Sequence, residues 1–520
     1  MKLSIAQYQP APDDTAAPPT FQVVTSDQSS GPPDTANLAT PYAGFDPDHV
    51  FYEAPTAKFY VRVGTHYRVY SRKTPVINGI ATHLALKEPR GQNANKQDPA
   101  GLAKDRVADI EMSKAVDWAG SIAGHQPGIL RLRGSALLVT DGPRLIDPAP
   151  GNFPVISSML DQALGTGIQQ QVFTAWLAIG LRAVIAARHQ PGPMMCLAGP
   201  VNTGKSLLAN LVKAVLGGRS ANPHTAWSGT LPWNDDLIGA ELQLMDDCED
   251  SIDIRSRRQL AARFKEAIYS NEVQMRKRHT SSISVRPVWR VMLCCNDTPE
   301  SLQIIPPIDD DLSDKVILLS VSRYEPPIDT SSIEGRDRLW AMITSELPAF
   351  VEHLANFEIP QEIRDPRAGV IAYRDHELEK AVTALSPERV MEDLLVTMNN
   401  HGHLAMHPGG EKVLTATELQ EKMVGQESVV ASQARTLFGR WPQACGVYLA
   451  KLARSRPDLV QDGKIYNGTQ RWIIKRPSER ASGGLVETFS TLEKQKDIQE
   501  RAGRQMKLPI REMNPPLHHG

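Results

Sequence analysis

The loop "GPVNTGKS" at residues 199–206 constrains the fold of this chain more than any other feature of its sequence. It matches the pattern G-x-x-x-x-G-K-[ST], follows the apolar run "MMCLA" and precedes "LLANLVKAVL", so we expect a strand, a phosphate-binding loop and a helix. Backbone N–H groups and the helix N-terminus would hold phosphates, Lys205 would reach the β and γ oxygens, and Ser206 would ligate Mg²⁺. The expected residues for binding ATP are Gly199, Pro200, Asn202, Thr203, Gly204, Lys205 and Ser206.

A second candidate strand ends in two carboxylates. In "AELQLMDDCED" the apolar residues precede Asp246 and Asp247, and doubly wound sheets place their sites at the carboxyl ends of strands. We expect Asp246 to bind Mg²⁺ and Asp247 to act as the general base on the attacking water. The alternative interpretation is a solvated acidic loop, and the phosphate-binding pattern upstream makes it less favoured.

A third apolar strand is expected over 288–295, and it ends in Asn296. The uncharged amide of Asn296 could hydrogen-bond the γ-phosphate or the lytic water without neutralising the two aspartates. An Asn at a strand end can also be a plain turn residue. The order of the three strand ends favours a polar sensor.

The charge of the chain reverses between the second and third of these strands. Residues 234–253 contain eight acids and no Lys or Arg, whereas residues 255–290 contain ten Lys or Arg and two Glu. Such a basic stretch can neutralise phosphates. Strand-like flanks surround a basic tip at Lys277, Arg278 and His279, for which a solvated surface loop is the alternative.

Composition limits the class of protein. The 520 residues, 41% hydrophobic and 22% charged, suffice for several domains, and a net charge of −2 excludes a uniformly basic nucleic-acid binder. Five cysteines without a C-x-x-C pair indicate reduced thiols in a cytosolic protein. No signal peptide or membrane span is expected, because the most apolar stretch, 172–187, contains Arg182 and is shorter than the ~20 residues that a bilayer needs.

Changes in texture along the chain predict an α/β fold with several parts. The N-terminal part alternates strand-like and helical patterns, which suggests a mixed α/β domain for assembly or substrate capture. The expected parts are a disordered segment at 1–42, that N-terminal domain at 43–165, a nucleotide-binding core at 166–330, a helical connector at 331–385, a winged-helix domain at 386–477 and a polar tail at 478–520.

The C-terminal part reads as three helices followed by a hairpin, which is a winged-helix pattern. "TATELQEKM", "SQARTLFGRWPQAC" and "GVYLAKLARSRPDLV" predict the helices, and Asn467-Gly468 supplies the turn of the hairpin. The third helix carries Lys451, Arg454 and Arg456, which suit contact with duplex DNA. A protein-docking module is the alternative.

The ordered motifs "GPVNTGKS", "LQLMDD", "FKEAIYSNEVQMRKRHTSS" and "VMLCCN" are similar to those of the superfamily 3 helicases. These are the AAA+ motors of papillomavirus and polyomavirus initiators and of parvovirus Rep. The chain resembles most the primase-helicase ATPases of poxvirus, phage or plasmid type. The resemblance covers residues 199–315 and implies a P-loop AAA+ core, and the primase-helicases also carry a winged helix.

The resemblance assigns further roles. It places the basic tip, with Arg278 and His279 at the matching positions, in the channel of a hexameric ring where it grips nucleic acid. It also places Lys265 against the nucleotide of the neighbouring subunit. The arginine finger of the family follows the Asn motif in a segment resembling "LxDR", and this chain has "LSDK" there, ending in Lys315. Lys lacks the planar fork of Arg, so either Lys315 is a weaker finger or Arg323 or Arg290 replaces it.

Together these features predict an ATP-dependent, ring-forming DNA helicase that acts on single-stranded or forked DNA. It would replicate a phage, plasmid or integrated element in a bacterial cytoplasm, with a separate primase or other replication proteins as partners. A AAA+ switch or loader that hydrolyses ATP without unwinding is the first alternative, supported by Lys315 in place of Arg. A P-loop phosphotransferase is the second, although no acceptor pocket or lid with Arg pairs is evident.

Overall fold

The computed structural model describes residues 45–87, 98–228, 234–246, 254–270, 272–276, 282–286, 288–306, 308, 312–404, 410–439 and 443–476. The predicted disordered segment 1–42 and polar tail 478–520 lie outside these ranges. The chain divides into two compact units, Met1–Thr383 and Ala384–Gly520.

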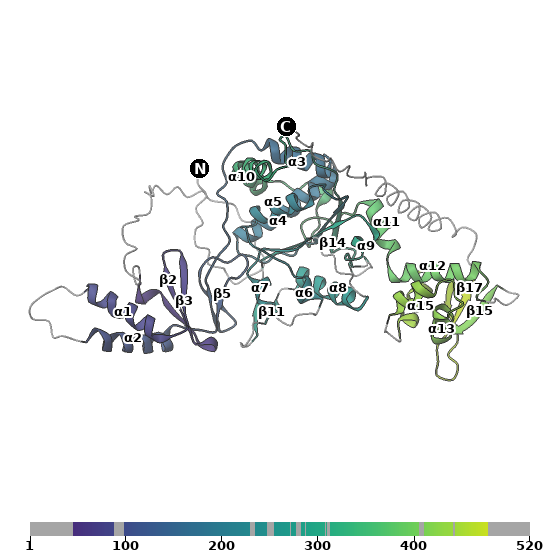
Figure 1. Cartoon of the computed structure of the whole chain (residues 1–520), viewed down its shortest axis with the longest axis horizontal. Helices are drawn as coiled ribbons and strands as arrows, with labels where there is room; N and C mark the ends of the chain where they lie inside the picture. The colour runs from purple at the N-terminus through teal and green to yellow at the C-terminus, as the bar shows by residue number, and fades with distance from the viewer. Residues whose placement is uncertain are drawn as a thin grey trace, which may run out of the picture. The chain divides into compact units, whose positions relative to one another are not determined.

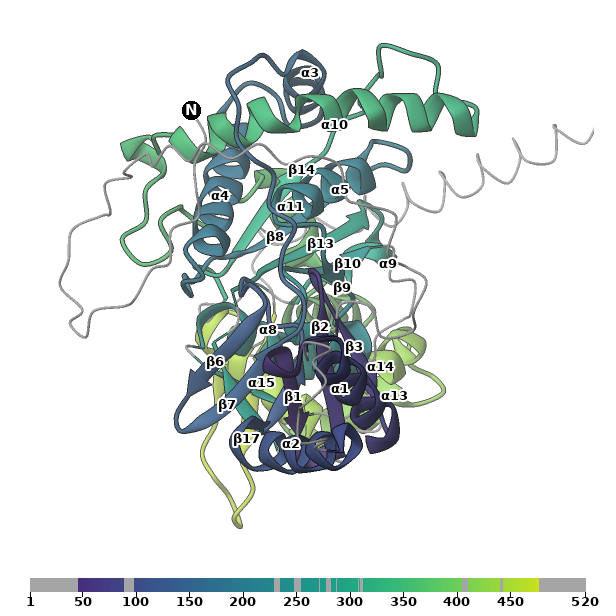
Figure 2. The same cartoon turned by 90° about the vertical axis from the view of Figure 1, so that its left-hand side faces the viewer.

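A five-stranded parallel sheet forms the centre of the first unit (Figures 1 and 2). Every pairing in it is parallel, so the carboxyl ends of all its strands lie at one edge. Two of its inner strands are largely apolar because helices bury both faces. In spatial order the strands are β14 (Val316–Ser320), β8 (Met194–Gly199), β13 (Arg290–Asn296), β10 (Leu242–Asp246) and β9 (Ser220–Ala221).

Helices cover both faces of this sheet, as Figure 2 shows. The larger layer shares one apolar cluster with β8, β13 and β14 and consists of α3 (Pro154–Leu164), α4 (Ile168–Ile185), α5 (Lys205–Val215) and α10 (Ile333–Asn356). On the other face lies α8 (Ile254–Tyr269), where the Trp289 indole donates to the carbonyl of Ala267 at 2.9 Å. The smaller helices of the unit are α6 (His224–Trp227), α7 (Asp235–Ile238), α9 (Pro299–Leu302) and α11 (His376–Ala384).

Helix α4 confirms the prediction of a buried helix, because twelve of its residues are buried. It packs against α10 within the apolar cluster of this unit. Among the described residues, no helix combines the length and the apolar character needed to cross a membrane.

The N-terminal module, residues 45–139, is mixed α/β as predicted. Its first sheet has the order β3-β2-β1-β4, with β1 (Val50–Glu53), β2 (Lys58–Val63), β3 (His66–Tyr70) and β4 (Ala115–Val116). The helices that pack on it are α1 (Lys73–Lys87) and α2 (Pro99–Ser113). The second sheet has the order β5-β7-β6, with β5 (Trp118–Gly120), β6 (Gly128–Leu132) and β7 (Ser135–Val139).

The hairpin β6–β7 turns at Arg133 and Gly134, with φ of 49° and 86°, and residues 140–153 form neither strand nor helix. Gly134 adopts the left-handed conformation at no steric cost, which explains why the chain reverses there.

A buried ion pair joins the N-terminal module to the edge of the parallel sheet. Glu241 is fully buried just before β10, and Arg219 just before β9 binds both of its carboxylate oxygens. Glu241 also accepts from the backbone N–H of Gly124 at 2.8 Å, and Arg219 donates to the carbonyl of Asp141 at 2.9 Å. The module is therefore tied to the strand that ends in Asp246.

In the part of the second unit that the structure describes, there are a three-stranded antiparallel sheet and four helices. Its elements are α12 (Pro387–Asn400), β15 (Glu411–Thr415), α13 (Ala416–Val424), α14 (Ala431–Phe438), α15 (Ala444–Ser455), β16 (Val460–Asp462) and β17 (Arg471–Lys475). Three of the helices confirm the predicted ones, and Thr415 and Glu418 begin α13 with a reciprocal capping box. The sheet order is β15-β17-β16.

The predicted hairpin of this unit is right in its turn and incomplete in its strands. Asn467 and Gly468 have φ of 50° and 74°, and β17 pairs with β16 across the turn as expected. However, β17 also pairs with β15, which the sequence did not predict. The segment "EKVLT" is short, and it begins with two charged residues, so its local pattern does not predict a strand.

The Arg219–Glu241 pair gives a test of this architecture. Glu241→Ala should lower the free energy of unfolding by about 3 kcal/mol, because Arg219 and the Gly124 N–H lose their buried acceptor. Glu266→Ala, the control, removes an exposed pair with Arg263 and should cost less than about 1 kcal/mol. Urea unfolding followed by tryptophan fluorescence compares the two, and equal losses would contradict the assigned importance of Glu241.

Candidate nucleotide-binding site

The loop between β8 and α5 has the backbone that its sequence predicts. A Cβ on Gly199 would lie 2.3 Å from the carbonyl oxygen of Val321, so only glycine fits at the end of β8. Gly204 and Asn202 have φ of 97° and 62°, in the left-handed region. Alternating left- and right-handed residues turn successive N–H groups toward one side, which forms an anion-binding concavity.

Lys205 lies in this loop with its ammonium group enclosed. The residue is 6% exposed, and Nζ donates to the carbonyls of Gly199 at 2.9 Å and Pro200 at 2.7 Å. Nζ also donates to Oδ1 of Asn296 at 3.1 Å. The first and third predicted motifs therefore meet through a direct hydrogen bond.

The strand register explains this contact. Asn296 ends β13 directly opposite Gly199 of β8, and Asp246 ends β10 opposite Cys294 of β13. Burial raises the pKa of the Cys294 thiol, the nearby Asp246 carboxylate raises it further, and Lys205 opposes the shift. Both charges act on Cys294, so Asp246 and Lys205 lie close to the carboxyl end of β13.

These residues fit a phosphate and a divalent cation. Ser206 is exposed in the first turn of α5, where backbone N–H groups point outward and favour an anion. The concave loop and the ammonium of Lys205 suit phosphate oxygens, while the Ser206 hydroxyl and the Asp246 carboxylate are oxygen ligands of the type that Mg²⁺ prefers. Asp247, the predicted base, lies outside the described residues.

Residues 321–324, whose contact with the loop the sequence did not predict, hold the loop in place through backbone hydrogen bonds. Val321 N–H donates to the carbonyl of Ala198 at 2.8 Å, and Tyr324 N–H donates to that of Thr203 at 3.3 Å. The segment shares no motif with the loop, and its only signal is its position after the apolar strand β14. Arg323 lies within it and is exposed, so this candidate finger lies beside the loop of its own chain.

Lys315 lies at the opposite edge of the sheet. It directly precedes β14, whose first residue pairs with the first residue of β8, so roughly 16 Å of strand at about 3.3 Å per residue separates it from the loop. Its side chain is 17% exposed, and Nζ lies 2.5 Å from a carboxylate oxygen of Asp314. The Tyr269 ring lies against it, 5.3 Å from Nζ.

The burial of Arg290 argues against it as the arginine finger. It is 3% exposed at the start of β13, and its guanidinium donates to the carbonyl of Gln190 at 2.9 Å. Burial lowers the pKa of Arg290 to about 10. A side chain enclosed in this way does not reach another molecule.

The predicted hairpin is present as two antiparallel strands, β11 (Val273–Met275) and β12 (Ile283–Val285). The side chain of Asn234 holds the first strand of the hairpin in place. Its amide donates to the carbonyl of Gln274 at 2.9 Å, and its oxygen accepts from Arg276 N–H at 2.7 Å. The predicted gripping residues Lys277, Arg278 and His279 fall between the two strands in the sequence and outside the described residues. Lys265 lies half-buried on α8.

Two of the three predicted DNA contacts in the second unit are engaged within it. Lys451 pairs with Glu388 of α12 at 2.6 Å. Arg456 binds Glu392 of α12, which is 5% exposed, and Asp458 at 2.8 Å. Arg456 therefore links α15 to α12, whereas Arg454 is exposed, and the assignment of these residues to DNA stays a prediction.

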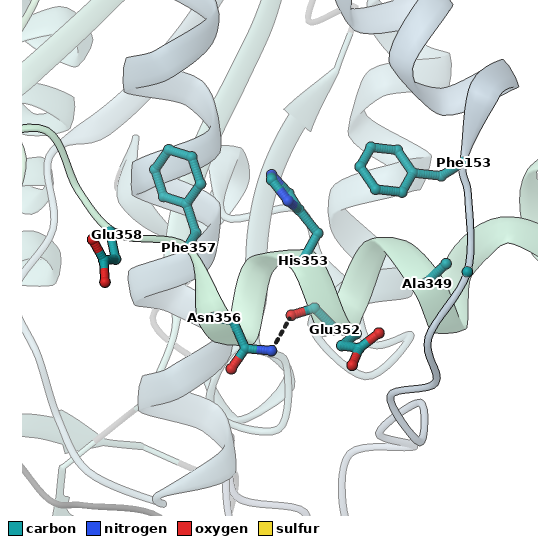
Figure 3. Close-up of a pocket in the computed structure, with 8 residues that line it drawn as sticks. Phe153, Ala349, Glu352, His353, Asn356, Phe357 and Glu358 are labelled. Carbon is teal, nitrogen blue, oxygen red and sulfur yellow. Dashed lines mark hydrogen bonds between the residues drawn. The ribbon is translucent and has the colours of Figure 1, made fainter. Parts of the chain in front are cut away.

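A separate hollow of about 350 Å³ lies along the C-terminal half of α10 (Figure 3). The rings of Phe153 and Phe357 flank His353, with centroids 5.2 and 5.6 Å from its ring. Burial lowers the pKa of His353. None of the predicted site residues lines this hollow.

Comparison with known proteins gives a family of undefined role. Residues 197–311, less than half of the chain, match a "Family of unknown function (DUF5906)". No curated protein matches the sequence. Among solved structures, the apo NrS-1 C terminal region is similar, with a TM-score of 0.47, 12% identity, and coverage of 82% of this chain and 95% of that one.

Two further solved structures are similar. The A form of the apo NrS-1 C terminal region has a TM-score of 0.45 at 12% identity, covering 82% of this chain and 96% of that one. JCV helicase with a bound acetamide compound has a TM-score of 0.20 at 12% identity, covering 46% and 65%. At such scores these likenesses carry no argument about function, which depends on the geometry of the site.

Gly199 gives a test of the site. Gly199→Ala should weaken the binding of a fluorescent ATP analogue at least ~10-fold, because the added methyl meets the Val321 carbonyl and displaces the loop. Gly167→Ala is the matched control, since a Cβ there would meet no atom within 4 Å and φ is −98°. Unchanged affinity in Gly199→Ala would mean that the loop does not hold the nucleotide.

Proposed function

We propose that this chain is a P-loop AAA+ ATPase that drives a DNA helicase during replication. The observation that carries the proposal is the 3.1 Å hydrogen bond from Lys205 to Asn296, at the sheet edge where β10 ends in Asp246. A strand inserted between the phosphate-loop strand and the acidic strand places a neutral amide next to the ammonium group. That arrangement suits a sensor of the γ-phosphate better than an acceptor site for phosphoryl transfer.

The proposed chemistry is ATP hydrolysis with Mg²⁺. Lys205 binds the β and γ oxygens, Ser206 and Asp246 hold the metal ion, and Asp247 deprotonates the attacking water. Mg²⁺ supplies neutralisation of the charge on the phosphate oxygens when it is bound. Gly199, Pro200, Asn202, Thr203 and Gly204 provide the backbone cradle in this proposal.

Nucleotide binding would change the contacts of Asn296. Lys205 now donates to Gly199, Pro200 and Asn296, and it must exchange these acceptors for phosphate oxygens. Asn296 is then free to contact the γ-phosphate or the water. Since β12 of the hairpin precedes β13 by only a short connection, a shift of Asn296 can pass along one strand to the hairpin.

The proposed partners are a DNA strand and further copies of this chain. We assign the grip on single-stranded or forked DNA to Lys277, Arg278 and His279. Lys315, just before β14, is too distant from the loop of its own chain to contact a nucleotide there. This distance supports an action of Lys315 on the nucleotide of a neighbouring copy in a hexameric ring. We assign the same role to Lys265. The hypothesis also includes a separate primase as a partner and a bacterial cytoplasm as the location.

The second unit supports a winged helix in this proposal. A helix, a strand, three helices and two strands follow one another, and the strands form a sheet in the order β15-β17-β16. Lys451 and Arg454 are both exposed on α15, and we assign Arg454 to DNA because Lys451 pairs with Glu388. The rival function is a AAA+ switch or loader, favoured by the ion pair that holds Lys315 against Asp314.

The nucleotide site is tested by steady-state ATPase measurements. Lys205→Ala should abolish turnover, and Asp247→Asn should keep nucleotide binding while lowering kcat at least ~100-fold, as expected for loss of a base. Lys213→Ala, two turns further along α5, is the control and should retain wild-type turnover. Near-normal kcat in Asp247→Asn would remove its assigned role.

The hairpin is tested by strand displacement and by DNA-stimulated ATPase. Arg278→Ala with His279→Ala should leave basal turnover intact and abolish both stimulation and unwinding, with a salt slope lower by roughly 0.7 per lost phosphate contact. Arg286→Ala, an exposed cation just after β12, is the control. Unwinding by the double variant at the wild-type rate would reduce the basic tip to a solvated loop, and ATP turnover without any unwinding in the wild type would favour the switch or loader.

A further inference from the structure

We propose that the tip loop of the second unit, residues 463–470, stacks on an unpaired nucleobase through Tyr466. The inference rests on the proposed action on DNA, but it concerns a surface that is separate from the nucleotide site and from the basic hairpin. The loop connects β16 to β17 and stands out from its unit as the yellow loop in Figure 1.

The tip loop exposes two large apolar side chains next to each other. Ile465 is 68% exposed and Tyr466 is 61% exposed. A single apolar residue at a surface needs no explanation, but adjacent ones on a projecting loop mark an interaction surface. Tyr contributes a large, flat ring with few rotatable bonds, which is a stacking platform that every base can use.

The loop is ordered before any partner binds. Tyr466 and Thr469 exchange backbone hydrogen bonds of 3.1 and 3.0 Å across the Asn467-Gly468 turn. The amide of Gln470 donates to the carbonyl of Gly463 at 2.9 Å. Because the backbone is fixed in this way, binding costs little conformational entropy.

Charge around the loop favours a polyanion. The guanidinium of Arg471 lies over the Tyr466 ring, 4.8 Å from its centroid, and covers one face of it. Lys464 is exposed within the loop, and residues 463–470 contain no acid, although Asp462 directly precedes them. Cations beside an exposed aromatic ring suit a sugar-phosphate backbone whose base stacks on the open face of the ring.

An unpaired base is a better fit than a closed duplex. Within a duplex each base is already stacked on both faces, so a protein ring gains contact only at an end, at a fork or on a single strand. Tyr466 would then hold the first unpaired base where the strands part. The partner that fits is therefore single-stranded or forked DNA.

The test measures binding of the full chain to DNA without nucleotide, so that its outcome does not depend on ATP turnover. A single-stranded oligonucleotide carrying 2-aminopurine reports stacking by quenching, and fluorescence anisotropy gives affinity. A covalently closed, relaxed duplex circle serves as the competitor without unpaired bases. Using Arg278→Ala with His279→Ala as the background removes the contribution of the proposed hairpin.

Tyr466→Ala should weaken single-strand binding about tenfold and abolish the quenching, as expected for one stacked base. Tyr466→Phe should stay within about twofold of wild type, which separates stacking from loss of fold. Val429→Ala, the control, changes another apolar residue of the unit that is 52% exposed and should have no effect. The affinity for the closed circle should be equal in all variants.

Equal single-strand affinities of Tyr466→Ala and wild type would overturn the proposal, and the tip loop would then fit a protein partner. A matching loss on the closed circle would also overturn it, because it indicates a phosphate contact or a damaged fold. Neither outcome affects the ATPase assignment, which stands or falls with Lys205→Ala.

Discussion

The hydrogen bond between Lys205 and Asn296 exists because β8 and β13 run in parallel with Gly199 opposite Asn296. A shift of one residue in this register would turn the amide to the other face of the sheet. On the other side of β8, the missing side chain of Gly199 lets the Val321 carbonyl approach. The whole candidate site therefore depends on close packing at one strand end, where an apolar interior meets a few polar groups.

The opposite, amino-terminal edge of the same sheet is held by charged groups. Glu241 is buried before β10 with Arg219, Arg290 is buried at the start of β13, and Lys315 pairs with Asp314 before β14. Each of these strands thus has an anchored start, and β10 and β13 carry a candidate functional group at the end. The N-terminal module, tied to Glu241, is therefore linked to the start of the strand that ends in Asp246.

The second unit shows how charge alone misleads. The sequence around its last helix is basic and contains no acid at residues 444–457. However, Arg456 forms an ion pair with the buried carboxylate of Glu392, and Lys451 forms one with Glu388. Removing a partner from such a buried pair is costly, so Arg456 has a structural task that competes with binding. Lys451 is exposed but paired with Glu388, so Arg454 and the exposed tip loop are the better candidates for contact with a partner.

The sequence by itself determined the features that depend on local rules. The strand, loop and helix around Lys205, the buried helix α4 and the hairpin strands β11 and β12 follow from periodicity and glycine geometry within a few residues. Strand β15, the support of residues 321–324 and the burial of Arg290 could not be read in that way. Their partners, such as Lys475, Ala198 and Gln190, lie far away in the chain, and only the tertiary structure brings them together.

The same reason explains which cations remain available. Lys205, Arg290, Arg454 and Arg456 all read as basic residues in promising places, yet the fold gives each a different environment. The free energy of a charge depends on its desolvation and on its nearest counter-charge, and both are set by packing. Sequence motifs therefore located the candidate nucleotide loop, while long-range packing decided which other charges remain available to a partner.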